Sequence, residues 1–231
     1  GHKDEICGVA LSPNGRRVVT ASRDKTLEVW FFDGAFEGPE QQGPLCRPLV
    51  LSGHSKSVRS VAYSSHPRHM IASGSDDCTV RIWNVESGAT VQELTGHTAP
   101  VLTVAYSPDG GHVVSGSADG TIRIWYTSNV ATPLILKGGF GSVRSVAYAN
   151  HRDYFASGSN DGKVRVWNAR TGRTMQKSVY RHDNHVTFVA FKYLGGDTYL
   201  VSGGEDKVNV WRLGMVDHKK SPFLSGIKSD A

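Results

Sequence analysis

Short stretches in which apolar and polar residues alternate recur along the whole chain, and each follows a polar turn and ends in tryptophan. The segment TASRDKTLEVW at 20–30 recurs in similar form as SGSDDCTVRIW at 73–83, SGSADGTIRIW at 115–125, SGSNDGKVRVW at 157–167 and SGGEDKVNVW at 202–211. The tryptophans lie 53, 42, 42 and 44 residues apart, and a Gly/Pro/Gln-rich insertion near 33–46 accounts for the longer first interval. This period predicts a repeated unit of about 40–45 residues.

A second motif precedes each of these phrases. It reads GHKDEICGVAL at 1–11, GHSKSVRSVAY at 53–63, GHTAPVLTVAY at 96–106, GGFGSVRSVAY at 138–148 and RHDNHVTFVAF at 181–191. Turn signals such as SPDG at 107–110 separate the two motifs, and an apolar stretch such as PLVL at 48–51 follows the tryptophan. Each unit therefore holds four short strands. We expect one domain over 1–231, with repeats at approximately 1–52, 53–95, 96–137, 138–180 and 181–226.

The chain resembles the WD40-repeat family of β-propellers over essentially its whole length, because the Gly-His opening, the SGSxD turn and the final tryptophan fall at that family's spacing. The usual Trp-Asp dipeptide is replaced by Trp-Asn, Trp-Tyr or Trp-Phe. The sequence motif VRSVAY also resembles the repeat arrays of fungal NACHT–WD40 receptor-like proteins. The resemblance implies an all-β propeller of four-stranded antiparallel blades, of which five are present. We expect these to be a segment of a larger, seven-bladed ring, with a compact five-bladed ring as the alternative.

The family implies a hydrogen-bond network that joins the four strands of each blade. Its members here are His2, Thr20, Asp24 and Trp30; His54, Ser73, Asp77 and Trp83; His97, Ser115, Asp119 and Trp125; Ser157, Asp161 and Trp167; and His182, Ser202, Asp206 and Trp211. The fourth unit has Gly139 where the histidine belongs. A buried polar network rigidifies only when it is fully satisfied, so we expect this blade to exchange its amide protons fastest.

A set of His, Ser and Asp also resembles a hydrolase triad, but a catalytic nucleophile is a single positioned group. A trio that recurs at fixed spacing from a tryptophan indicates architecture instead. The histidines and the three cysteines lack metal-ligand spacing. We therefore expect no enzymatic activity, no metal and no cofactor.

The first strand of each unit predicts where a partner binds. In VRSVAY the apolar residues Val58 and Val61 are three positions apart, where a regular strand requires two, and the same step occurs in every unit. An extra residue implies a β-bulge, which re-aims side chains. In the family this strand is innermost, so its start lies on the top rim of the central channel. We define the top rim as Glu5, Cys7 and Arg23; Ser57, Arg59 and Asp76; Pro100, Leu102 and Ala118; Ser142, Arg144 and Asn160; and His185, Thr187 and Glu205.

The top rim carries three arginines, three acids and an apolar spot, which favours a protein or peptide partner. A nucleic-acid footprint needs a basic stripe, and the net charge of +5 is modest. A ligand- or nucleic-acid-binding propeller that uses Arg59 and Arg144 is the alternative, and the sensor part of a larger receptor-like protein is a narrower one. The insertion at 33–47 falls on the opposite face, and we expect an ordinary loop there.

Composition narrows the cellular setting. Apolar residues make up 39% of the chain and charged residues 20%, as in ordinary globular domains. The given sequence shows no visible signal peptide, no apolar run that could span a membrane, no glycosylation sequon and no CxxC pair. We expect a cytoplasmic protein, with a nuclear location as the alternative, and not a secreted one.

Overall fold

The computed structural model describes residues 1–32, 48–65, 69–128, 132–137, 141–149, 153–205, 207–213 and 224–226. This part of the chain contains twenty β-strands, joined by turns, and no helix. The strands of the first two sheets are β1 (Ile6–Leu11), β2 (Arg17–Ser22), β3 (Thr26–Phe31), β4 (Leu49–Ser52), β5 (Val58–Tyr63), β6 (Met70–Ser75), β7 (Val80–Asn84) and β8 (Thr90–Leu94). The third and fourth sheets hold β9 (Val101–Tyr106), β10 (His112–Ser117), β11 (Thr121–Tyr126), β12 (Leu134–Lys137), β13 (Val143–Tyr148), β14 (Tyr154–Ser159), β15 (Lys163–Asn168) and β16 (Thr174–Arg181). The last sheet holds β17 (Val186–Leu194), β18 (Asp197–Gly204), β19 (Val208–Leu213) and β20 (Leu224–Gly226).

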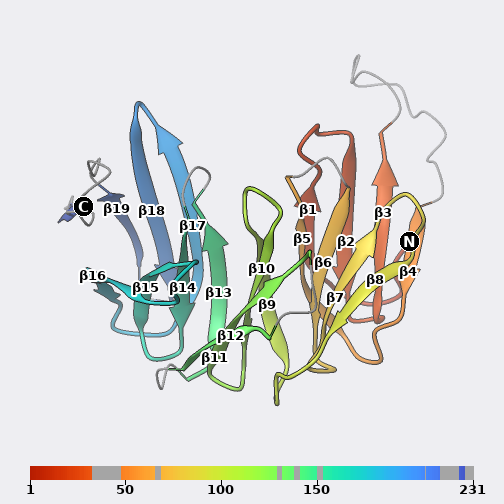
Figure 1. Ribbon diagram of the computed structural model, residues 1–231, viewed down its shortest axis with the longest axis horizontal. Helices are drawn as coiled ribbons and strands as arrows, with labels where there is room; N and C mark the ends of the chain where they lie inside the picture. Colours follow the sequence, from red (N-terminus) through yellow and green to blue (C-terminus); the bar gives the residue numbers. More distant parts are fainter. Residues whose placement is uncertain are drawn as a thin grey trace.

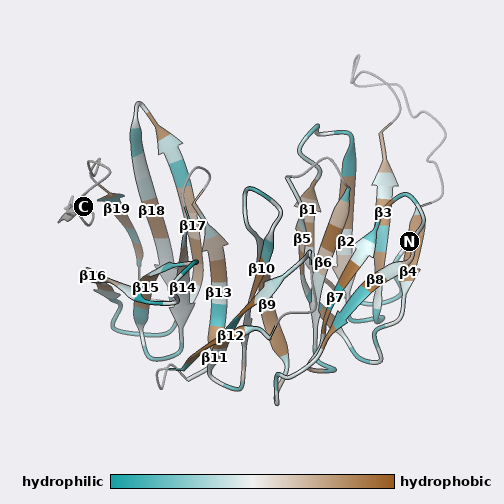
Figure 2. Ribbon diagram, viewed as in Figure 1, coloured by the Kyte–Doolittle hydropathy of each residue, from teal (hydrophilic) through white to brown (hydrophobic). Residues whose placement is uncertain are grey.

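Each sheet consists of four antiparallel strands that are consecutive in the chain, which is the blade architecture expected from the sequence. The five blades follow one another in chain order across the molecule, with the first and the fifth blade at opposite sides (Figure 1). Hydrophobic positions concentrate in the strands, whereas the turns are mostly polar (Figure 2). The fourth blade ends at Arg181, one residue beyond the boundary predicted at 180.

The hydrophobic core lies between neighbouring blades. Leu27 and Val29 of the first blade, both fully buried, pack with Val58, Val61 and Tyr63 of β5, and equivalent clusters fill the other three interfaces. The period-two alternation produces this arrangement because each strand presents one set of side chains to each neighbouring blade.

Polar bonds also join the blades. The backbone N–H groups of Val104, Val146 and Val189 donate to the hydroxyl groups of Ser60, Thr103 and Ser145, respectively, in the preceding blade, at 3.0–3.1 Å. The equivalent residue in the first blade is Gly8, which has no hydroxyl to offer.

The two end blades each present an apolar face. Ile6, Val9 and Leu11 of β1 are 54%, 65% and 66% exposed, although they occupy the positions of the buried Val58, Val61 and Tyr63. On the last blade Val208 and Val210 are 59% and 44% exposed, although the equivalent Val164 and Val166 of the fourth blade are buried. Among the described residues β17 does not pack on β1 as β13 packs on β9. The number of blades in the intact ring stays a prediction.

Some of the expectations fall on residues outside the described part of the chain. These are the insertion at 33–47, Gly139 and Asp206.

Candidate binding surface

The second blade shows how the repeated polar residues fit together. Trp83 donates from its indole N–H to the hydroxyl oxygen of Ser73 at 2.8 Å, and Ser73 lies 2.8 Å from Nε2 of His54. Nδ1 of His54 lies 2.8 Å from Oδ2 of Asp77. Because the serine oxygen accepts from tryptophan, its proton points to Nε2, and the histidine proton on Nδ1 then points to the carboxylate. Ser73 is fully buried within the blade, so the His–Ser–Asp trio has no room for a substrate.

The same bonds recur in three other blades with local differences. In the third blade His97 lies 2.7 Å from Asp119 and 2.8 Å from Ser115, which also accepts from Trp125. In the first blade His2 contacts Asp24 and Thr20, and Trp30 reaches Thr20 at 3.4 Å. In the fifth blade His182 and Trp211 both contact Ser202.

The fourth blade satisfies its aspartate in a way that the sequence analysis did not foresee. Trp167 still donates to Ser157 at 2.8 Å. The buried side chain of Arg165 forms an ion pair with Asp161, with Nη2 at 2.6 Å from Oδ2, and Ser159 donates to the same carboxylate. Arginine therefore gives Asp161 the hydrogen-bond donor that histidine gives to the aspartates of the other blades, and this removes part of the reason to expect a soft fourth blade. The exchange rates themselves stay a prediction.

These networks predict that the protein loses stability in acid. Burial would raise the pKa of Asp77, but hydrogen bonds from Thr79 and His54 outweigh it and lower the pKa to about 2, and Asp119 behaves in the same way. Burial lowers the pKa of His54 and His97 below the ordinary 6.5, against the pull of their aspartates. In both cases the unfolded chain binds protons more readily than the folded chain, so these groups contribute their full stabilisation above about pH 6.5. The free energy of unfolding falls as the pH drops below that value. Urea unfolding between pH 7.5 and 3 should show this loss, and a rise in stability from pH 7 to 5 would contradict it.

The predicted β-bulges are present at the start of the first strand in all five blades. The registers shift between Ile6 and Gly8, Val58 and Ser60, Val101 and Thr103, Val143 and Ser145, and Val186 and Phe188. The residues left over by these shifts are Cys7, Arg59, Leu102, Arg144 and Thr187, all of them members of the top rim. The bulge turns these side chains away from the regular alternation of the strand.

A repeated backbone bond brings the members of the top rim together in the first four blades. The N–H groups of Arg23, Asp76, Ala118 and Asn160 donate to the carbonyl groups of Glu5, Ser57, Pro100 and Ser142, respectively, each at 2.9 Å. In the fifth blade His185, Thr187 and Glu205 are exposed, and the Thr187 hydroxyl donates to the carbonyl of Gly203.

Charged pairs form within single blades of the top rim. Arg59 forms a two-pronged ion pair with Asp76, with its closest approach at 2.7 Å, and Arg23 lies 2.9 Å from Glu5. Arg144 differs, because its Nε donates to the neutral Oδ1 of Asn160 at 2.8 Å. Among the described residues no carboxylate pairs with Arg144, which is exposed.

The described ranges contain neither of two further kinds of site. No group of three or more His, Cys, Asp or Glu side chains there could hold a metal ion. No helix there is long and apolar enough to cross a membrane.

The family follows from a direct comparison. The model of the family described as "WD domain, G-beta repeat" matches residues 1–30, 46–84, 88–126 and 132–168. The chain belongs to the WD40 repeat family. The matches end within the fourth blade, and the fifth WD40 blade, β17–β20, is seen in the structure.

Several curated WD40 relatives match parts of the chain. THO complex subunit 3 of Arabidopsis thaliana is 31% identical over 49% of this chain and 34% of its own length. Human Coronin-7 is 35% identical over 41% of this chain and 10% of its own length. Protein HIR1 of Cryptococcus neoformans is 30% identical over 46% of this chain and 14% of its own length. The chain therefore spans about a third or less of these relatives, and the resemblance to NACHT–WD40 proteins stays a prediction.

Proposed function

We propose that this WD40 chain is a non-enzymatic scaffold that binds protein or peptide partners through the top rim, in the cytoplasm or the nucleus. The observation that carries the proposal is Arg144. This exposed arginine is held by a neutral asparagine, so its charge remains available to a partner's carboxylate. WD40 domains generally mediate protein binding, which supports the same role.

The surroundings of Arg144 favour a protein surface over a nucleic acid. Arg59 and Arg23 are each paired with an acid of the same blade, so among the described residues of the first four blades the rim presents one arginine without an acidic partner rather than a basic stripe. Leu102 and Pro100 of the neighbouring blade add an apolar spot, and interfaces with proteins combine such spots with arginine anchors.

Affinity capture from a cell lysate tests the proposal, with wild type, Arg144→Glu and Lys137→Glu as baits. Lys137 is exposed on the outer strand β12, so its variant reverses the same charge away from the rim. We expect Arg144→Glu to lose partners that Lys137→Glu retains, at least about tenfold, as for loss of a charged contact at the centre of an interface. Partners retained by both variants, or lost equally by both, would move the binding surface away from the top rim.

A further inference from the structure

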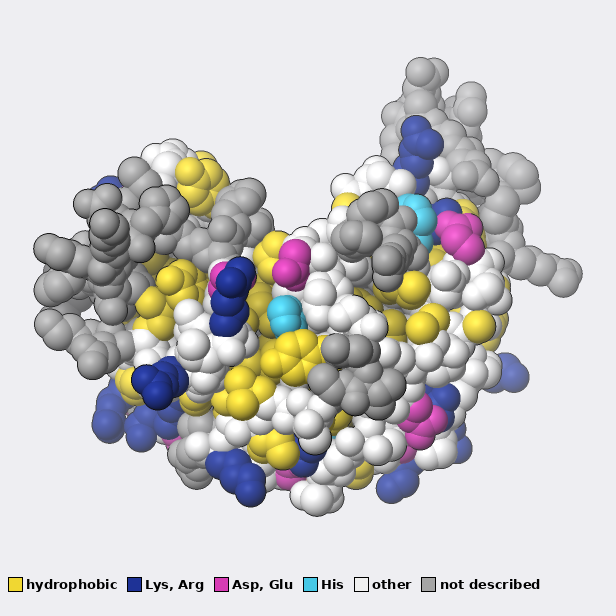
Figure 3. All heavy atoms as spheres, viewed as in Figure 1, with side chains coloured by type: hydrophobic (Ala, Val, Ile, Leu, Met, Phe, Trp, Pro, Cys, Tyr) yellow, Lys and Arg dark blue, Asp and Glu magenta, His cyan; other side chains and the backbone are white. Residues whose placement is uncertain are grey.

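A cavity of about 390 Å³ opens between the third and fourth blades, at the end of the strands opposite the top rim. Tyr148 at the end of β13, His112 at the start of β10 and Arg170 in the turn after β15 line it, together with Asp109 and Asp153. The surface is hollowed over β10 and β13, where hydrophobic, acidic, basic and histidine side chains meet (Figure 3).

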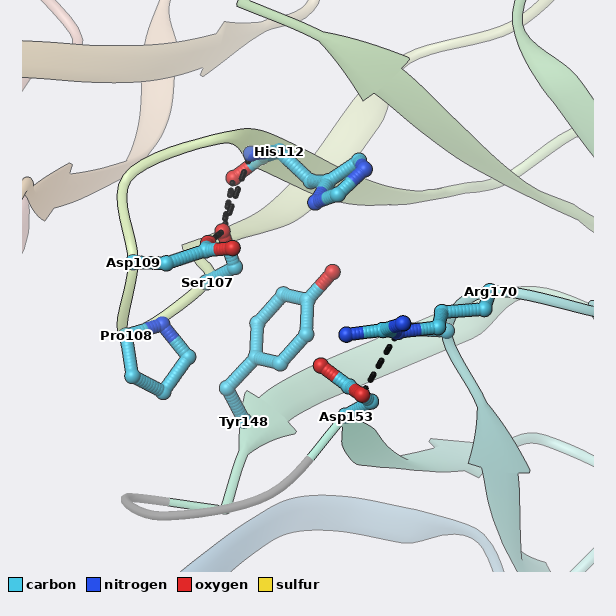
Figure 4. A pocket seen from close by; sticks show the side chains of 8 residues that line it. Ser107, Pro108, Asp109, His112, Tyr148, Asp153 and Arg170 are labelled. Carbon is cyan, nitrogen blue, oxygen red and sulfur yellow. Dashed lines mark hydrogen bonds and ion pairs between the residues drawn. The ribbon is translucent and has the colours of Figure 1, made fainter.

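The hydroxyl group of Tyr148 faces this cavity. The residue is only 8% exposed, and its hydroxyl oxygen is buried without a hydrogen-bond partner among the described residues. Leaving such a group unpaired destabilises a protein, so the hydroxyl is a ready donor for a ligand. Figure 4 shows the hydroxyl pointing between the ring of His112 and the guanidinium of Arg170. Burial and the nearby carboxylates of Asp109 and Asp153 raise the pKa of Tyr148, so the hydroxyl keeps its proton and can donate it.

The interface between the first and second blades carries different charged residues at the corresponding positions. Arg17, at the start of β2, corresponds to His112, at the start of β10. Tyr63, at the end of β5, corresponds to Tyr148, at the end of β13. Glu86 corresponds to Arg170, because each lies three residues after the tryptophan of its blade. Nη1 of Arg17 pairs with Oε1 of Glu86 at 2.7 Å. Between the third and fourth blades the arginine is replaced by histidine and the glutamate by arginine. Neither of these two positions therefore carries a carboxylate in the later interface.

The acids near the cavity are already engaged. Asp109 accepts from the hydroxyl of Ser107 and from the N–H of Gly111, which lowers its pKa. Asp153 pairs with Nε of Arg170 at 2.6 Å. That pair uses one edge of the Arg170 guanidinium. Nη1 and Nη2 of Arg170 form no hydrogen bond with the described residues.

We propose that this cavity binds the carboxylate of an aspartate or glutamate side chain from a partner protein. The carboxylate would accept from the Tyr148 hydroxyl and from the outer nitrogens of Arg170, and His112 would supply a third donor. It would pair with the arginine of this interface, as Glu86 pairs with Arg17 in the first. A carboxylate fits better than a phosphate, because the single arginine already shares its charge with Asp153 and a dianion needs more compensation.

The test follows the ring resonances of histidine and tyrosine by NMR during titration with the capped peptide acetyl-Ala-Glu-Ala-amide. We expect saturable shifts at His112 and Tyr148, with a dissociation constant of roughly a millimolar for one such contact. The glutamine peptide, in which the amide replaces the carboxylate, should cause none. Acetate should compete with the glutamate peptide, and phosphate at equal concentration should compete less well.

Variants separate this site from general effects on the fold. Tyr148→Phe and Arg170→Gln should each weaken binding at least about fivefold, the loss expected for a hydrogen bond to a charged group. Tyr106→Phe is the matched control, because Tyr106 is also 8% exposed and its hydroxyl is unpartnered, but Met70 and Ser128 stand in the places of His112 and Arg170. Shifts that do not saturate, equal binding of the glutamine peptide, tighter binding of phosphate, or an equal loss in Tyr106→Phe would each overturn the proposal. Arg144→Glu should leave this binding unchanged, so its outcome is independent of the top rim.

Discussion

Replacing Asp77 by alanine is expected to lower the free energy of unfolding by about 2–4 kcal/mol, whereas replacing the adjacent Asp76 should cost about 1 kcal/mol or less. The carboxylate of Asp77 is 8% exposed and accepts from His54, from the N–H groups of Ser55 and Thr79, and from the Thr79 hydroxyl. Its removal leaves buried donors without an acceptor. Asp76 pairs with Arg59 on the rim, where the two side chains are 18% and 36% exposed, so losing this partly solvated ion pair costs less than losing the acceptor of a buried network.

Urea unfolding followed by circular dichroism measures both variants against wild type. The two substitutions remove the same chemical group from neighbouring positions, so they differ only in what the carboxylate contacts. The dependence of the unfolding free energy on urea should be unchanged, because neither variant alters the surface exposed on unfolding. Equal losses for the two variants would show that the network does not hold the second blade together.

The strands and the bulges could be predicted from the sequence because both are local patterns. The step of three residues between Val58 and Val61 is sufficient to expect a bulge, and the registers place one there. The bonds from Trp83 through Ser73 to His54 also recur in a fixed order along the chain, so the repetition itself reveals them.

The role of Arg165 could not be predicted in this way, because it depends on what lies across the sheet. In the second blade the equivalent Arg81 sits opposite Glu93 of the outer strand and pairs with it at 2.7 Å. In the fourth blade Val179 lies opposite Arg165, so the arginine turns to Asp161 instead. A basic residue without a cross-strand acid, in the unit that lacks its histidine, was the available signal.

The bonds between blades and the cavity at Tyr148 were missed for a related reason. Each depends on residues of two units that lie about 40 positions apart and meet only when the sheets pack. Ser60 and its equivalents looked like ordinary strand residues, yet they accept from the next blade. Only an alignment of the units, position by position, shows that Arg17 corresponds to His112 and that Glu86 corresponds to Arg170.

The exposed faces of the two end blades lead to the second large expected effect, which is self-association of residues 1–231. A blade face of this kind is buried in every internal interface, so the face of β1 and the face of β19 are complementary to one another. Two copies can therefore join head to tail, a heterologous contact that continues from copy to copy. Sedimentation velocity should show species that grow with concentration.

Lysine substitutions distinguish this contact from others. Leu11→Lys on β1 and Val208→Lys on β19 should each weaken the association at least about tenfold, because either one places an unpaired charge in an apolar interface. Val91→Lys, on the outer strand β8 and 51% exposed in wild type, adds the same charge away from both faces and should have little effect. A heterologous contact requires both faces, so either lysine alone suffices to break it. An effect of Leu11→Lys without one of Val208→Lys would instead indicate that two first blades meet symmetrically, and a wild-type chain that stays monomeric at high concentration would contradict both arrangements.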